Sequence, residues 1–144
     1  MNYTDKNNQF VVFELDNEEY GIDILRVKTI EKMSNITRVP KTASYIKGVI
    51  NLRGEIVPII DLREKFNLDK KEESENTRII IVYVDDINVG LIVDSASKVI
   101  EISNDMVELP PESLGNTEQN NIYGIGKLDD KIITLLDVKK LLNV

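Results

Sequence analysis

The sequence of 144 residues contains no cysteine, no histidine and no tryptophan, and only 6% of its residues are aromatic. Without cysteine the chain has no disulfide, no thiolate nucleophile and no cysteine-ligated zinc or iron–sulfur site, which suits a reducing compartment. Without histidine it lacks the side chain that most often transfers protons near neutral pH. Ser-His-Asp and Cys-His catalysis are therefore excluded, and we expect neither enzyme activity nor a cofactor.

Long hydrophobic runs and a positive net charge are missing as well. The apolar segments at residues 78–84 and 89–93 are far shorter than the ~18 residues that indicate a membrane span. The polar N-terminus has no signal-peptide pattern, so we expect a cytoplasmic protein without direct membrane insertion. The net charge of -7 would repel a phosphate backbone, so nucleic acid is not an expected partner.

What the chain does contain is a series of short apolar segments rich in Val, Ile and Leu. Polar or glycine-containing turns separate them at close intervals, which is typical of antiparallel sandwiches and small barrels. The sequence therefore predicts a mainly β fold. The expected strands cover residues 10–15, 20–24, 46–50, 56–60, 79–84, 89–93 and 132–136.

An internal duplication runs through these segments. Residues 13–24 align with residues 82–93, and residues 48–63 align without a gap with residues 124–139. Glycine, leucine, isoleucine and aspartate recur in register, which indicates two pseudo-equivalent units. The prediction is one domain at residues 9–144 with pseudo-repeats at about 9–70 and 77–144, between which strands can be exchanged.

Each copy ends with an aspartate in front of a short segment of helical composition. These aspartates are Asp61 and Asp137, and aspartate is a favoured helix N-cap because its carboxylate accepts from free backbone N–H groups. Glu64 follows Asp61 at the spacing of an acidic capping box. We therefore expect a capping role for both aspartates.

Carboxylate pairs are the remaining route to acid–base or metal chemistry. The candidates are Asp16, Asp85, Asp86, Asp129 and Asp130, and all of them lie in predicted hairpin turns. Aspartate favours such turns because it tolerates unusual backbone angles and bonds to its own main chain. No calcium-loop spacing is present. A turn role is favoured, and the alternative is a carboxylate-dependent metal hydrolase that uses Asp85, Asp86 or Asp129.

Two features favour protein docking. Equivalent hairpin turns carry Arg53-Gly54 in one copy and Asp129-Asp130 in the other. A turn benefits from glycine but does not require an arginine, so an exposed Arg53 is a candidate interaction anchor, with a solvated turn arginine as the alternative. The apolar residues at 24–30 fit neither strand alternation nor a long helical face. Some of them are expected at the surface, where they suit an amphipathic helix, and ordinary core is the alternative.

Five segments carry a resemblance to a known family. They are EYGIDI (residues 19–24), ITRVP (36–40), YIKGVINLRGEIVPIIDLR (45–63), TR (77–78) and VGLIVD (89–94). The nineteen-residue block is the most specific, because it joins strand, turn, strand and cap in one fixed spacing. Together they resemble the CheW-like domains of bacterial chemotaxis over residues 9–142. The resemblance implies two five-stranded SH3-like β-barrels packed together, with short helices.

The same resemblance implies a function. CheW-like adaptors couple methyl-accepting chemoreceptors to the histidine kinase CheA, at the inner face of the membrane. They bind the regulatory domain of CheA and hold the helical tip of the receptor in a groove between subdomains. In this sequence Val27, Ile30 and Val99 would line the receptor groove with Arg53 at its edge, and Ile24 would face the kinase. A CheV-type coupling protein would need a fused receiver domain, and we do not expect that class here.

Overall fold

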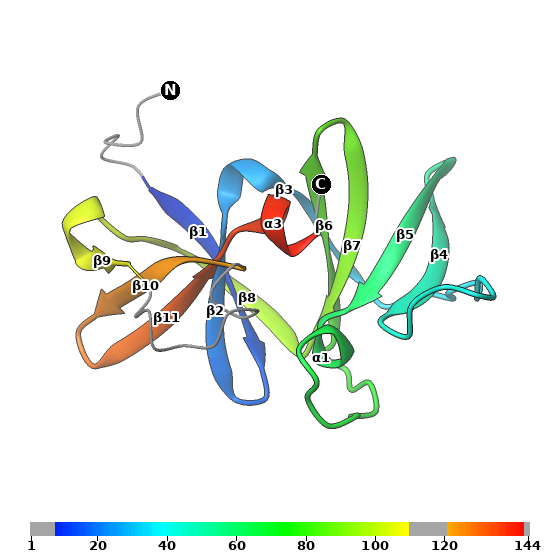
Figure 1. The fold of residues 1–144 in the computed structure, drawn as a ribbon, viewed down its shortest axis with the longest axis horizontal. Coiled ribbons are helices and arrows are strands. Elements are labelled where there is room, and N and C mark those ends of the chain that lie inside the picture. Colours follow the sequence, from blue (N-terminus) through cyan, green and yellow to red (C-terminus); the bar gives the residue numbers. More distant parts are fainter. Residues whose placement is uncertain (1–7, 110–120, 143–144) are drawn as a thin grey trace.

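The computed structural model describes residues 8–109 and 121–142, and most of their regular structure is β-strand (Figure 1). The prediction of a mainly β fold is confirmed. Sheet A consists of β1 (Gln9–Leu15), β2 (Glu18–Asp23), β8 (Ser95–Glu101), β9 (Val107–Glu108), β10 (Ile122–Leu128) and β11 (Lys131–Leu136). Sheet B consists of β3 (Val27–Lys32), β4 (Ile46–Leu52), β5 (Glu55–Asp61), β6 (Arg78–Val84) and β7 (Ile87–Val93). The helices are η1 (Ile24–Arg26), α1 (Leu62–Lys65), η2 (Asn104–Met106) and α3 (Val138–Leu141).

The two sheets have the same arrangement of strands. Their orders are β8-β1-β2-β11-β10-β9 in sheet A and β3-β6-β7-β5-β4 in sheet B. In each sheet one parallel pairing, β2 with β11 or β7 with β5, joins antiparallel hairpins. Hairpin β1–β2 therefore completes the sheet of the later strands, and hairpin β6–β7 completes the sheet of the earlier ones. The short strand β9 gives sheet A its sixth member, and the pseudo-repeat boundaries stay a prediction.

The seven strands expected from composition are confirmed to within a residue or two at each end. The edge strands β3 and β8 were not expected as strands. A β-bulge interrupts each of them where it pairs with its neighbour, so their side chains do not alternate in the simple way that identifies a strand. The irregular segment at residues 24–30 is thus a short η1 helix followed by the bulged start of β3.

The predicted helix caps are confirmed, but the capping box is wrong. The carboxylate of Asp61 accepts from the Arg63 amide at 3.0 Å, and that of Asp137 accepts from the Lys140 amide at 3.1 Å. Glu64 does not reach back to the Asp61 amide, which donates to the Tyr45 carbonyl at 2.8 Å. The Glu64 carboxylate instead accepts from the Lys47 ammonium at 3.3 Å.

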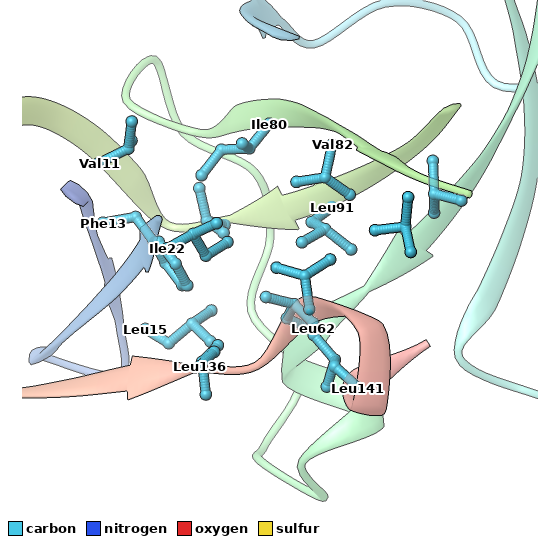
Figure 2. Close-up of a cluster of buried hydrophobic side chains, with 14 residues drawn as sticks. Val11, Phe13, Leu15, Ile22, Leu62, Ile80, Val82, Leu91, Leu136 and Leu141 are labelled. Carbon is cyan, nitrogen blue, oxygen red and sulfur yellow. The ribbon is translucent and has the colours of Figure 1, made fainter. Parts of the chain in front are cut away.

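The main hydrophobic core lies between the two sheets (Figure 2). Phe13 of sheet A and Leu91 of sheet B are buried in it, together with Leu62 of α1 and Leu141 of α3. Each helix thus contributes a leucine to the same cluster. Since full burial of such a side chain stabilises by about 1.5–3 kcal/mol, this cluster holds the sheets together. Two smaller clusters fill the other side of each sheet, with Phe10, Val12, Ile102, Ile133 and Leu135 in sheet A and Ile50, Val57, Ile59, Ile79 and Ile81 in sheet B.

The turn aspartates lie where the sequence predicts them. Asp16, Asp85, Asp86 and Asp129 have positive φ values of 54°, 49°, 66° and 52° in the hairpin turns. Aspartate adopts this left-handed region more readily than most residues, so the turn role is confirmed for these four. Asp130 completes the same turn as Asp129.

Candidate functional site

The residues expected at the receptor groove lie on two edge strands, β3 of sheet B and β8 of sheet A. On β3, Val27 pairs with Val82 and Ile30 pairs with Ile80. Both partners are buried in the core between the sheets. Because directly paired residues project to the same face of a sheet, Val27 and Ile30 also face the inter-sheet side. The bulge after Val27 explains how two residues three positions apart share one face.

Strand β8 repeats this arrangement. Val99 pairs with Val11 and Ala96 pairs with Phe13, and a bulge again lies between the two pairs. Val11 and Phe13 belong to the same inter-sheet core, against which Ala96 packs. Sequence reasoning missed Ala96. Extending the alignment of residues 13–24 with residues 82–93 makes Ala96 the equivalent of Val27 in the other copy. We call the set Val27, Ile30, Ala96 and Val99 the apolar strip.

Only part of the apolar strip is covered by the protein. Val27 and Ala96 are half-buried against the core, whereas Ile30 is 42% and Val99 is 49% exposed. The strip therefore presents one exposed aliphatic side chain from each sheet, both on the inter-sheet side. Both side chains are therefore accessible to a partner on this side.

The expectation that residues 24–30 contribute surface apolar groups is confirmed. Leu25 is the most exposed of them, at 73%, and its backbone amide donates to the Asp23 carboxylate at 2.9 Å. Ile24, the residue predicted to face the kinase, is half-buried and packs against the inter-sheet core. Sequence reasoning missed Leu25, which projects from the short η1 helix beside Ile24.

Arg53 lies in the β4–β5 turn with a positive φ of 50°, and its side chain is 67% exposed. Its guanidinium donates to the Glu31 carboxylate at 3.1 Å. The neighbouring Thr29 hydroxyl and the Arg53 guanidinium together lower the pKa of Glu31 from its usual value. Arg53 is thus exposed, as expected, but it is also an ion-pair partner rather than a freely solvated turn arginine.

The position of Glu31 shows which face of sheet B Arg53 contacts. Glu31 pairs with Ile79, whose side chain lies in the cluster on the other face of sheet B. Ile30 and Glu31 are adjacent on β3 and project to opposite faces. Arg53 therefore contacts β3 from the face opposite the apolar strip, and the ion pair links the β4–β5 turn to the far edge of the same sheet.

The geometry offers little for metal or small-molecule chemistry. In residues 8–109 and 121–142, no group of three or more acidic side chains is placed to hold a metal ion. Two pockets of about 360 and 430 Å³ lie beside Lys47 and Lys70, and no residue of the apolar strip lines either one. None of the helices in the described part of the chain has the length and hydropathy of a membrane span.

Comparison with known proteins identifies the family. The family model described as the CheW-like domain matches residues 9–144. The chain belongs to the CheW family. It is 41% identical to the chemotaxis protein CheW of Klebsiella aerogenes, over 94% of this chain and 81% of that protein. It is 40% identical to the chemotaxis protein CheW of Bacillus subtilis, over 94% of this chain and 86% of that protein.

A solved structure agrees with the fold. The crystal structure of the scaffolding protein TtCheW from Thermoanaerobacter tengcongensis superposes with a TM-score of 0.88 at 40% identity. The match covers 96% of this chain and 94% of TtCheW. The chemotaxis protein CheV3 of Helicobacter pylori is 32% identical over 86% of this chain, which spans 41% of CheV3. The CheW family consists of scaffolds rather than enzymes, so this chain is a chemotaxis adaptor with protein partners.

Proposed function

We propose that this adaptor binds the cytoplasmic tip of a chemoreceptor and the regulatory domain of the histidine kinase CheA, and transmits the state of the receptor to the kinase. The observation that carries the proposal is the apolar strip, which draws exposed aliphatic residues from the edge strands of both sheets. The family membership supplies the class of partner. The site of action is cytoplasmic, beside chemoreceptor arrays at the inner face of the membrane.

The chemistry of the strip suits a receptor helix. An amphipathic helix presents apolar side chains on one face at intervals of three and four residues. Ile30 and Val99 are exposed on either side of the inter-sheet core, and the partly buried Val27 and Ala96 lie beside them. A helix laid on this surface would remove both exposed side chains from water, which favours binding by roughly 25 cal/mol per Å² of apolar area.

For the kinase, the proposed contact is the η1 region. Ile24 is the residue that the family resemblance assigns, and the neighbouring Leu25 is 73% exposed. A large exposed leucine next to a half-buried isoleucine is the kind of apolar anchor on which protein interfaces depend. We therefore assign the contact to Ile24 together with Leu25.

The mechanism is a coupling of binding energies. An adaptor that touches receptor and kinase at once changes the kinase equilibrium only when its contacts differ between receptor states. Rigid packing between the two sheets gives such a device a fixed geometry, because Leu62 and Leu141 bury both helices in the shared core. No bond is made or broken by the adaptor itself.

Substitution within the strip tests the receptor site. Ile30→Asp places a charge where the helix would dock, and we expect at least a tenfold loss of affinity for a soluble receptor-tip fragment in a pull-down or calorimetric titration. Ile87→Asp is the matched control, because Ile87 is also a strand isoleucine of similar exposure, 48%, outside the strip. Equal losses in the two variants, or none in Ile30→Asp, would count against the proposed site.

A second set of variants tests Arg53. Arg53→Glu is expected to weaken receptor binding while the protein stays folded. Glu31→Gln removes the ion pair but keeps the arginine, so it should bind the receptor almost normally if Arg53 itself is the anchor. If Glu31→Gln is as weak as Arg53→Glu, the ion pair acts on β3 instead. Unchanged binding by folded Arg53→Glu would remove Arg53 from the site.

A further inference from the structure

Each α-helix is tied to a hairpin turn of the opposite sheet. Helix α1 follows β5 of sheet B, and its Arg63 pairs with Asp16 in the β1–β2 turn of sheet A at 3.3 Å. Helix α3 follows β11 of sheet A, and its Lys139 pairs with Asp85 in the β6–β7 turn of sheet B at 3.6 Å. The sequence duplication aligns Arg63 with Lys139 and Asp16 with Asp85. In Figure 1, α1 lies at the bottom of the view, toward the β1–β2 turn, whereas α3 lies higher, toward the β6–β7 turn.

The contact at α1 has several hydrogen bonds, and Arg63 and Asp94 are buried in it, whereas the Asp16 side chain is 59% exposed. The Arg63 side chain is only 9% exposed and donates through three nitrogens, to Asp94 at 2.7 Å, to Asp16 at 3.3 Å and to the Asp69 carbonyl at 2.8 Å. The Asp94 carboxylate also accepts from the Asp16 amide at 2.8 Å. We call Arg63, Asp16 and Asp94 the arginine clamp. An arginine fork that meets several acceptors in a buried setting fixes the relative position of the elements that carry them.

The contact at α3 is exposed and has a single ion pair. The side chains of Lys139 and Asp85 are 50% and 49% exposed, and we call them the lysine pair. Continuing the alignment of residues 13–24 with 82–93 places Leu25 where the other copy has Asp94. The lysine pair therefore lacks the second carboxylate that completes the arginine clamp. Exposed pairs of this kind contribute little to stability.

The backbone shows the same difference. We call the contact of each helix with the hairpin turn of the opposite sheet a junction. At the α1 junction the Asp94 amide donates to the Glu14 carbonyl of β1 at 3.0 Å, and β8 begins at the next residue, Ser95. The equivalent amide of Leu25 turns back to the Asp23 carboxylate of its own segment. The η1 helix takes up residues Ile24–Arg26, and β3 begins only at Val27. A backbone hydrogen bond to β1 thus anchors the start of β8. At the equivalent position of the other copy, the start of β3 is held by a turn within its own segment.

We infer that the two edge strands that carry the apolar strip differ in mobility. Strand β8 is the fixed edge and strand β3 is the yielding edge. The arginine clamp fixes β8 with Ala96 and Val99, whereas η1 and the lysine pair let β3 with Val27 and Ile30 shift. The further step, that β3 is the edge that adjusts when a receptor helix docks, rests on the proposed function. The difference between the two edges in the free protein does not.

Hydrogen exchange of the free, full-length protein tests the inference directly. Corrected for intrinsic rates, the segments at 14–17 and 94–96 should exchange at least tenfold more slowly than the equivalent segments at 83–86 and 25–27, because opening is easier where fewer hydrogen bonds close a junction. Equal protection of the two sets would overturn the inference, whatever the receptor fragment does.

A gain-of-contact variant sharpens the test without removing a buried group. Leu25→Asp combined with Lys139→Arg rebuilds the three side chains of the arginine clamp at the other junction, and we expect it to slow exchange at 83–86 and 25–27 to within a few-fold of the opposite side. Lys139→Arg alone, which lacks the second carboxylate, should leave that exchange almost unchanged. A double variant that exchanges as fast as the unmodified protein would show that the clamp does not set the difference.

Addition of a receptor-tip fragment separates the inference from the proposed function. With the fragment bound, protection should rise more at 25–30 than at 94–99, and the rebuilt variant should bind more weakly because β3 can no longer adjust. If the free protein shows the asymmetry but the fragment does not bind, the proposed function fails and the difference between the edges stands. If the fragment binds and protects both edges equally, the adjustable role of β3 is contradicted.

Discussion

The two junctions between the sheets differ far more than the strands that they join. Sheets A and B share one strand order, and both helices are capped by an aspartate. Yet one junction is closed by the arginine clamp, in which Arg63 and Asp94 are buried, and the other by an exposed lysine pair. The decisive change is Asp94 in one copy against Leu25 in the other. The two copies of a duplicated fold can therefore have equivalent cores while one junction is more rigid than the other.

The largest effect is expected where the arginine clamp is broken. Asp94→Leu, which copies the residue of the other junction, leaves the buried Arg63 with only Asp16 as a charged partner. Removing one partner of a buried ion pair costs about 3–5 kcal/mol, so the free energy of unfolding in a denaturant titration should fall by about 3 kcal/mol. The control is Leu25→Ala at the equivalent exposed position, with a change within about 0.5 kcal/mol. A loss below about 1 kcal/mol in Asp94→Leu would contradict the clamp's role, given what a buried unpaired charge costs.

A second comparison concerns two equivalent glycines, Gly48 in β4 and Gly124 in β10. A Cβ at Gly48 would lie 2.0 Å from the Thr37 carbonyl oxygen, and its φ is 142°. A Cβ at Gly124 would meet a methyl group of Val107 at 2.7 Å, and the backbone contact there is looser, 3.1 Å to the Glu108 carbonyl oxygen, without a positive φ. Backbone cannot yield as a side chain can, so we expect Gly48→Ala to destabilise by about 2–3 kcal/mol and Gly124→Ala by about 1 kcal/mol. Thermal unfolding measures both, and an inverted order would show that the β4 edge is less constrained than its contacts indicate.

At the yielding junction the expected effect is small. Lys139→Ala removes an ion pair whose members are each about half exposed, so the free energy of unfolding should change by no more than about 0.5 kcal/mol. The measurement is the same denaturant titration, repeated at high salt, which screens exposed pairs. A loss comparable to that of Asp94→Leu would abolish the distinction between the two junctions.

The smallest effect concerns the ion pair that links Arg53 to β3. Arg53 helps to lower the pKa of Glu31, so Arg53→Ala should raise that pKa toward its usual value of 4.5, with the Thr29 hydroxyl still lowering it. A carboxyl with a lowered folded-state pKa stabilises the protein above its unfolded-state pKa, and this contribution is lost as the pH falls through the folded-state pKa. An NMR titration of the Glu31 carboxyl between pH 2 and 6 measures the shift. No movement of the pKa would show that Arg53 does not act on Glu31 in solution.

Short sequence patterns predicted the features that depend on interactions between residues close together in the chain. Turn aspartates, the two N-caps and seven strands follow from side-chain size, backbone preference and hydrogen bonding over a few residues. Glu64 shows where such patterns fail. Its spacing fits a capping box, but its carboxylate binds Lys47, which is distant in the sequence. The bulged strands β3 and β8 also escaped prediction, since an extra residue disrupts the alternation by which a strand is recognised.

The candidate site depended on information that lies far apart in the sequence. Val27, Ile30 and Val99 came from a family resemblance, and only the strand register shows that they share a face with Ala96. The arginine clamp could not be predicted at all. Arg63 and Asp94 meet because β7 pairs in parallel with β5, and the sequence allowed an exchange of strands without showing which strands pair.

The most direct test of the adaptor function is reconstitution. Soluble receptor-tip fragments, the kinase CheA and this protein are combined, and the rate of ATP consumption by the kinase is followed with and without the adaptor. We expect receptor-dependent kinase activity only when the adaptor is present, with Ile87→Asp active and Ile30→Asp inactive. A kinase rate that is the same with and without the folded adaptor would contradict the account.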